Sequence, residues 1–144
     1  MKGFLHGLKK GGKKMENIVT KFTTIYKEIK KEKGDFYLFM ILKMDEITDK
    51  WSVVVSAPWF NGRNQKECFE YVARKITKNL SKDEITTIAR VGLFLPNEHL
   101  IMLVNGAVKI ENCDAPVKFE NTQMNGFKIH EAYIYESIPQ KNEK

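Results

Sequence analysis

The sequence predicts a single α+β domain with about five strands in a mixed or antiparallel sheet and two to three helices. Residues 36–42 are seven consecutive apolar residues. A run this short cannot span a bilayer, which needs about 20 residues, and is typical of a strand covered on both faces. Residues 51–57 alternate apolar with smaller side chains, as in a half-buried strand. Residues 16–33 repeat apolar positions along one helical face, and the expected order of elements is α-β-β-α-β-α-β-β.

The first two strands are expected to form an antiparallel hairpin, with residues 36–42 at the centre of the sheet. A polar turn at 45–50 separates the strands, and Pro58, which has no backbone N–H, ends the second one. Met40 lies in the middle of the apolar run and is therefore expected in the core.

One helix precedes this hairpin and another follows it. Helix 16–33 has lysines near its C-terminal end, where they favour the helix dipole, and Gly34 can adopt the left-handed conformation that ends a helix. Helix 65–79 starts after Asn64, which stands three residues before Glu67 in the spacing of a capping box. The residues that helix 65–79 is expected to bury are Cys68, Phe69, Val72, Ile76 and Leu80.

A second capping box, Ser81 with Glu84, predicts a further turn of helix. The β-branched residues at 85–88 then favour a change to a strand at 89–95, which Pro96 ends. This would be the third strand of the sheet.

Residues 97–109 are compatible with a helix or with the second half of a hairpin. Their apolar residues fit helical spacing, with Asn97 as the N-cap. Against this, Gly106 costs about 1 kcal/mol inside a helix, and residues 96–98 would suit a turn. We expect the helix, because the apolar positions keep the helical period.

Two strands are expected at the end of the chain, at 116–120 and 127–135. The Asn125-Gly126 pair between them is typical of a tight hairpin. The residues expected on one face of the last strand are Phe127, Ile129, Tyr133 and Tyr135.

The net charge of +6 is unevenly distributed. Residues 1–14 carry five lysines and no acidic residue, whereas the remainder has 19 basic and 18 acidic residues, a net charge of +1. Residues 1–14 are expected to form a basic flexible N-terminal arm. If Met15 is itself a start, they are instead residues added by an expression vector or an alternative N-terminus. Residues 15–138 form the globular domain, and 139–144 form a polar tail.

The expected location is the cytoplasm. The first residues lack the apolar stretch of a secretory signal, because glycines interrupt it. The two cysteines, Cys68 and Cys113, are therefore expected to be reduced thiols. No run of residues is long and apolar enough to predict a transmembrane segment.

No residue pattern predicts a metal or a cofactor. The three histidines, His6, His99 and His130, have none of the short spacings of metal ligands, and no glycine-rich phosphate loop is present. We expect neither a metal site nor a cofactor.

Cys113 and His130 could form a nucleophilic pair only if the fold brought them together. Glu131 cannot orient the His130 ring, because neighbours on a strand point to opposite faces. His130 is expected on a solvated face with Lys128 and Ala132, which favours a non-catalytic protein. An enzyme whose site is assembled in space remains the alternative.

Trp59 and Phe60 are two large apolar residues in a loop directly after a proline. One interpretation is a hydrophobic plug beneath helix 65–79. The other is a partner-binding patch formed by Trp59, Phe60, Asn61 and Arg63, since tryptophan and arginine are enriched at interface hot spots.

These observations predict a small non-catalytic binding or accessory module that self-associates or binds a protein partner. The alternative is a nucleic-acid-binding protein that uses the arm residues Lys2, Lys9, Lys10, Lys13 and Lys14. A membrane-surface role for the arm is a third hypothesis, although Phe4, Leu5 and Leu8 would bury little apolar area.

Overall fold

The structure of the chain, a computed structural model, describes residues 2–44, 50–60, 64–111, 115–124 and 126–141, and for 2–17, 124 and 127 it describes the backbone. In chain order the elements are α1 (Lys2–Lys33), β1 (Leu38–Met44), β2 (Trp51–Ser56), the 3-10 helix η1 (Pro58–Phe60), α2 (Gln65–Asn79), α3 (Lys82–Ile85), β3 (Ile88–Leu93), α4 (His99–Ala107), β4 (Val117–Met124) and β5 (Phe127–Ser137). The α+β class is confirmed, and the short α3 is the further turn of helix expected after Ser81.

The five strands form one mixed sheet in the order β3-β2-β1-β5-β4. β1 is antiparallel to both β2 and β5, and β4 is antiparallel to β5. β2 and β3 run parallel, because α2 and α3 carry the chain back along the sheet between them. The apolar run around Met40 therefore forms the central strand, as the sequence predicted.

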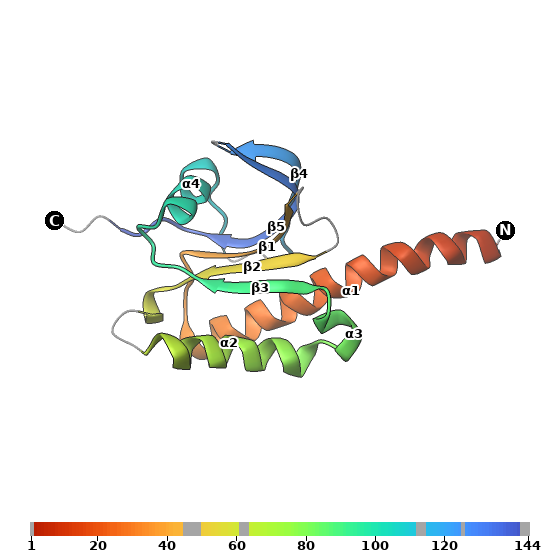
Figure 1. Cartoon of the computed structure of the whole chain (residues 1–144), viewed down its shortest axis with the longest axis horizontal. Coiled ribbons are helices and arrows are strands. Elements are labelled where there is room, and N and C mark those ends of the chain that lie inside the picture. The colour runs from red at the N-terminus through yellow and green to blue at the C-terminus, as the bar shows by residue number, and fades with distance from the viewer. Residues whose placement is uncertain (1, 45–49, 61–63, 112–114, 125, 142–144) are drawn as a thin grey trace.

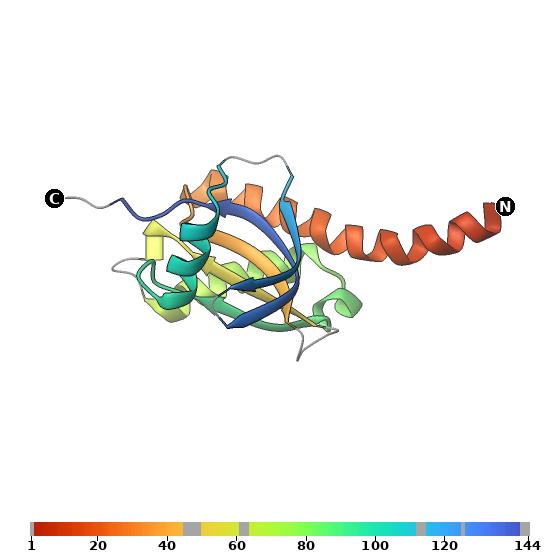
Figure 2. The same ribbon diagram turned by 90° about the horizontal axis from the view of Figure 1, so that it is seen from above.

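Helices cover both faces of the sheet (Figure 1). α1, α2 and α3 lie on one face, and α4 lies on the other. The N-terminal half of α1 projects past the edge of the sheet, away from every other element, in both views (Figures 1 and 2).

The larger core lies between the sheet and the first three helices, and we call it the α1-side core. Its aromatic members include Phe22 and Tyr26 from α1, Phe39 from β1 and Tyr135 from β5. The rings of Tyr26, Phe39 and Tyr135 lie with centroids 5.4–5.8 Å apart in tilted and edge-on pairs. Such aromatic packing holds α1 across the central strands.

The second core lies between the sheet and α4, and we call it the α4-side core. It contains Leu38, Met40 and Leu42 of β1 together with Ile101 and Val104 of α4. Alternate residues of β1 therefore serve the two cores, which explains why its sequence is apolar without a break.

The expectation that the second strand is half-buried is wrong. All six residues of β2 are buried, including Ser52 and Ser56. The reason is α4, whose core covers the face that the serines and Val54 occupy. Small polar side chains suggested an exposed face, but a serine is small enough to fit between layers.

The prediction that Ile129 shares one face of the last strand with Tyr133 and Tyr135 is also wrong. The consecutive β1 residues Lys43 and Met44 pair with Glu131 and Ile129, so β5 has one extra residue at this point. Such a bulge reverses the alternation of side chains. Ile129 consequently packs in the α4-side core, whereas Tyr133 packs against the α1-side core.

Several helix details differ from expectation. Phe69 is 42% exposed, because it lies on the flank of α2 beside the buried Cys68. The N-cap of α4 is Glu98 rather than Asn97, and its carboxylate accepts a hydrogen bond from the Leu95 N–H instead of capping the helix. Both capped helix starts are confirmed, at Asn64 for α2 and at Ser81 with Glu84 for α3.

The backbone of residues 2–14 is helical, whereas no long helix was expected there. Four glycines weakened the helical pattern in the sequence, but the arm continues the register of the well-packed part of α1 without interruption. Among the described residues no helix is both long and apolar enough to cross a membrane.

Candidate functional site

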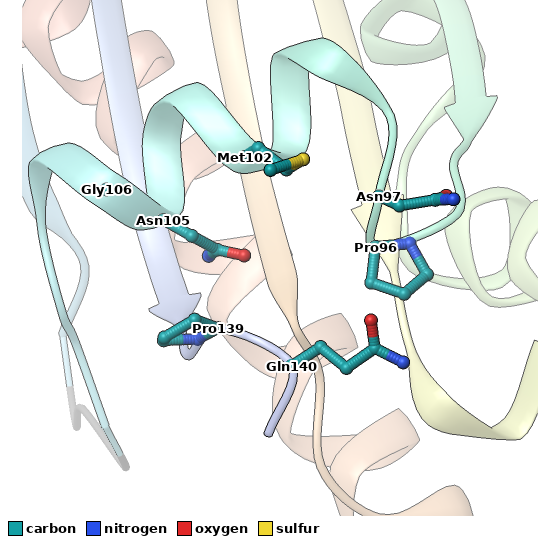
Figure 3. A pocket seen from close by; sticks show the side chains of 7 residues that line it. All are labelled: Pro96, Asn97, Met102, Asn105, Gly106, Pro139 and Gln140. Atoms are coloured by element: carbon teal, nitrogen blue, oxygen red, sulfur yellow. The ribbon is translucent and has the colours of Figure 1, made fainter. Parts of the chain in front are cut away.

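A groove of about 330 Å³ opens between α4 and the segment that follows β5 (Figure 3). The connection from β3 to α4 and the segment after β5 form its two walls, and α4 closes it along one side. Its lining residues are Pro96, Asn97, Met102, Asn105, Gly106, Pro139 and Gln140.

The Asn105 side chain is held in place at the base of this groove. Its Nδ2 donates to the backbone oxygen of Tyr37 at 3.0 Å and to Ser137 Oγ at 2.9 Å. The Ser137 hydroxyl in turn donates to the Val108 carbonyl at 2.9 Å. The amide orientation is therefore determined, and its oxygen points towards the middle of the groove (Figure 3).

The groove is uncharged and partly apolar. None of the seven lining residues carries a titratable side chain; they are three amides, two prolines, a methionine and a glycine. Met102 is 58% exposed, and Leu95, which precedes the lining residue Pro96 in the sequence, is 50% exposed. They are the most exposed large apolar residues among those described. This arrangement can bind an uncharged group by shape and by hydrogen bonds to amides.

The two described residues of the predicted partner-binding patch, Trp59 and Phe60, are partly packed against the domain. The Trp59 ring makes edge-on contacts with Phe60 and with Tyr71 of α2, at centroid distances of 4.6 and 5.5 Å. Both loop aromatics are half-buried against the α1-side core. These contacts match the plug interpretation, and the remaining patch residues, Asn61 and Arg63, lie outside the described residues.

Lysine side chains surround the Trp59 and Tyr71 rings. Lys33 Nζ lies 5.0 Å from the centroid of Tyr71 and 5.7 Å from that of Trp59. The Tyr71 hydroxyl donates to Glu32, which also accepts from Lys75 at 2.8 Å. These bonds lower the pKa of Glu32, while burial and the Glu32 carboxylate raise the pKa of Tyr71. The cluster joins the end of α1 to α2.

A second polar cluster lies under α1. The carboxylate of Glu136, on β5, is fully buried and accepts hydrogen bonds from the Tyr26 hydroxyl at 2.6 Å and from Lys30 Nζ. Burial alone would lower the pKa of Lys30, but hydrogen bonds to Asp35 and Glu136 raise it above its ordinary value. Every one of these groups has a partner, as in a structural ion pair.

A third cluster lies on the β4–β5 hairpin. Burial and a 2.7 Å hydrogen bond to Glu131 raise the pKa of Tyr133 to about 12, so its hydroxyl stays protonated near neutral pH. Lys118 Nζ lies 3.0 Å from Glu120. Lys118 also joins the two strands, since its Nζ lies 4.0 Å from Glu131 and 5.7 Å from the centroid of the Tyr133 ring. A protonated tyrosine whose hydroxyl already donates to a carboxylate is not placed to act as a base.

The arm lysines Lys2, Lys9, Lys10, Lys13 and Lys14 lie on the projecting half of α1. The helix as a whole carries ten lysines and three glutamates.

The candidate nucleophilic pair is not described, because Cys113 lies outside the described residues. His130 is exposed as expected. Ala132 was expected on the same solvated face but is buried, so that prediction is wrong. Cys68 is a buried free thiol in α2. No group of three or more potential metal-ligating side chains is present within the described parts of the chain.

Comparison of the chain with protein-family models, with curated proteins and with solved structures gave no match.

The groove was missed at the sequence level. Its residues come from three separate segments, and none belongs to a residue type that marks catalysis or metal binding. The one available signal was Asn105, a polar residue in the otherwise apolar stretch 100–108. A polar side chain among apolar ones needs hydrogen-bond partners where it is partly buried, so its position indicated a specific structural or binding role.

Proposed function

We propose that this chain is a small non-catalytic binding module whose groove takes an uncharged, peptide-like segment of a partner. The Asn105 amide carries this proposal. Its nitrogen is fixed by Tyr37 and Ser137, and its oxygen is directed into the groove. A pre-oriented acceptor favours a ligand with an N–H donor, because little conformational entropy is lost when the bond forms.

The apolar lining supports the same ligand class. Met102 adapts its flexible side chain to different apolar groups, and Pro96 and Pro139 supply rigid walls. A volume of about 330 Å³ is at the lower end of ligand-pocket sizes, which run from about 300 to 1,000 Å³. It suits one or two residues of a peptide.

The chemistry of the lining argues for binding and against catalysis at this place. Proton transfer needs a titratable group within hydrogen-bond distance of the reacting atom. The lining residues offer amide, thioether and ring carbon groups instead. A charged ligand would also lose its hydration without gaining a counter-charge.

Self-association and a cytoplasmic location remain parts of this proposal. The internal packing of Trp59 and Phe60 gives self-association through that patch no support. The buried free thiol of Cys68 is compatible with a reducing compartment.

The test is a titration of the ¹⁵N-labelled protein with N-acetylleucinamide, which combines N–H donors with an apolar side chain. We expect saturable amide shifts at Met102, Asn105 and Gly106, and weaker shifts with the fully N-methylated analogue. The charged N-acetylleucine is expected to bind less well than the amide. Absence of shifts at these residues, or equal shifts with the N-methylated analogue, would contradict the proposal.

A further inference from the structure

The projecting half of α1 continues the pattern of the part that is packed on the sheet. Ile18, Phe22, Ile25 and Ile29 are buried in the α1-side core at alternating spacings of four and three residues. Counting back from Ile18 with the same spacings reaches Met15, Gly11, Leu8 and Phe4. Three of these four positions are apolar, so the core-facing series of α1 extends beyond the domain.

All five lysines of the projecting turns lie away from this series. At about 100° per residue, Lys14 stands roughly 90° to one side of the mean direction of this series and Lys9 roughly 130° to the other side. Lys13 stands nearly opposite to it. Residues 2–14 contain no acidic residue. The arm is therefore an amphipathic helix with a basic face, on a segment beside which no other described element lies (Figures 1 and 2).

The glycines of the arm indicate that this part of the helix needs contact with another surface to be stable. Gly3, Gly7, Gly11 and Gly12 lower the intrinsic helix propensity, and short isolated helices are marginal in water. A surface that covers the apolar positions and neutralises the lysines would stabilise the helix.

We propose that residues 2–15 of α1 bind the surface of an anionic phospholipid bilayer, with the apolar positions at the acyl boundary and the lysines at the headgroups. Basic amphipathic helices bind such surfaces through apolar burial and electrostatic attraction together. Lysines that flank the apolar positions reach the headgroups because their long stems extend along the interface. This proposal is independent of the groove.

The apolar series decides between the lipid surface and the other partners. A nucleic acid would neutralise the lysines but would leave Phe4, Leu8 and Met15 without a role. A second copy of the arm would cover the apolar positions but would bring five lysines against five. An anionic bilayer satisfies both features.

The experiment is cosedimentation of the full chain with vesicles of phosphatidylcholine containing phosphatidylserine, at physiological ionic strength, with pure phosphatidylcholine vesicles as reference. Two variants remove one feature each: Lys9→Glu/Lys13→Glu and Phe4→Ser/Leu8→Ser. The matched control, Lys82→Glu/Lys141→Glu, makes the same charge change at two exposed lysines outside α1.

We expect binding to the anionic vesicles alone, a loss of roughly tenfold or more in both arm variants, and retention in the control. Thermal unfolding should be the same in all four proteins, because the arm lies outside both cores. Three results would overturn the proposal: no vesicle binding, vesicle binding that the control loses equally, or full retention in Phe4→Ser/Leu8→Ser. In the last case, salt-sensitive binding to duplex DNA that only Lys9→Glu/Lys13→Glu loses would identify nucleic acid as the partner.

Discussion

Lys30 and Glu136 meet beneath α1, where the lysine Nζ lies 3.0 Å from both oxygens of a fully buried carboxylate. The two residues are 106 positions apart, so the contact fastens the first helix to the last strand. A buried carboxylate is tolerated only with such partners, and the Tyr26 hydroxyl provides the other one.

Lys30→Met should lower the free energy of unfolding by about 3 kcal/mol, because it leaves the buried carboxylate without its cation. The lower end of the usual range applies, since the lysine side chain is 23% exposed. Chemical denaturation measures the change. Lys31→Met, at an exposed neighbour, should stay within about 0.5 kcal/mol of the parent. Equal losses in both variants would show that the ion pair is unimportant.

Glu84 should contribute to the loss of folding stability at acidic pH. Burial alone would raise the pKa of this carboxyl, but hydrogen bonds from Lys21 and from the Ser81 N–H hold it below its ordinary value. A lowered folded pKa stabilises the protein above the unfolded value of about 4.3, and this stabilisation disappears as the pH falls through the folded pKa.

Glu84→Gln should therefore have a lower melting temperature than the parent at neutral pH. The difference should be constant at neutral pH and should shrink as the pH falls below about 4.3. Melting temperatures across a pH series provide the measurement. A difference that grows on acidification would have the wrong sign for this account.

Trp59→Ala tests the packing of the aromatic loop. Removal of a core tryptophan costs about 3–5 kcal/mol, and the half-buried Trp59 should cost about 2–3 kcal/mol. Phe69→Ala is the control, because Phe69 is exposed and should change stability by less than about 1 kcal/mol. Sedimentation should show the same oligomeric state for both variants and the parent. A stable Trp59→Ala protein with altered association would instead support the partner-binding patch.

Local patterns predicted most of the fold. The uninterrupted apolar run around Met40 identified the central strand, and Asn64 and Ser81 marked helix starts, because these signals depend on neighbours in the sequence. The burial of Ser52 and Ser56 depends on tertiary packing, and no local pattern contains it. The bulge that turns Ile129 to the other face arises from pairing with β1 and likewise could not be predicted from local sequence.

The candidate groove depends still more on tertiary structure. Asn105 becomes a fixed acceptor only because Tyr37 and Ser137, both distant in sequence, receive its N–H groups. The aromatic loop was noticed because its composition is unusual, and its packing against Tyr71 depends on the fold. The unusual composition of the Trp59–Phe60 loop therefore marked a segment that packs against the domain. The groove is lined by α4, whose sequence has no unusual composition.

Gly106 provides the most direct test of the groove. It lines the groove on α4, and a Cβ added there would meet no atom within 4 Å. Gly106→Ala should raise the free energy of unfolding by about 0.4–1 kcal/mol and leave the groove open. Gly106→Trp should fold normally and place its ring across the groove.

The decisive measurement is the affinity of N-acetylleucinamide for these two variants and the parent, followed by amide shifts. The account predicts that Gly106→Ala binds like the parent and that Gly106→Trp loses binding by tenfold or more, a difference of about 1.4 kcal/mol. Unchanged affinity in a folded Gly106→Trp protein would contradict the assignment of the groove as the binding site.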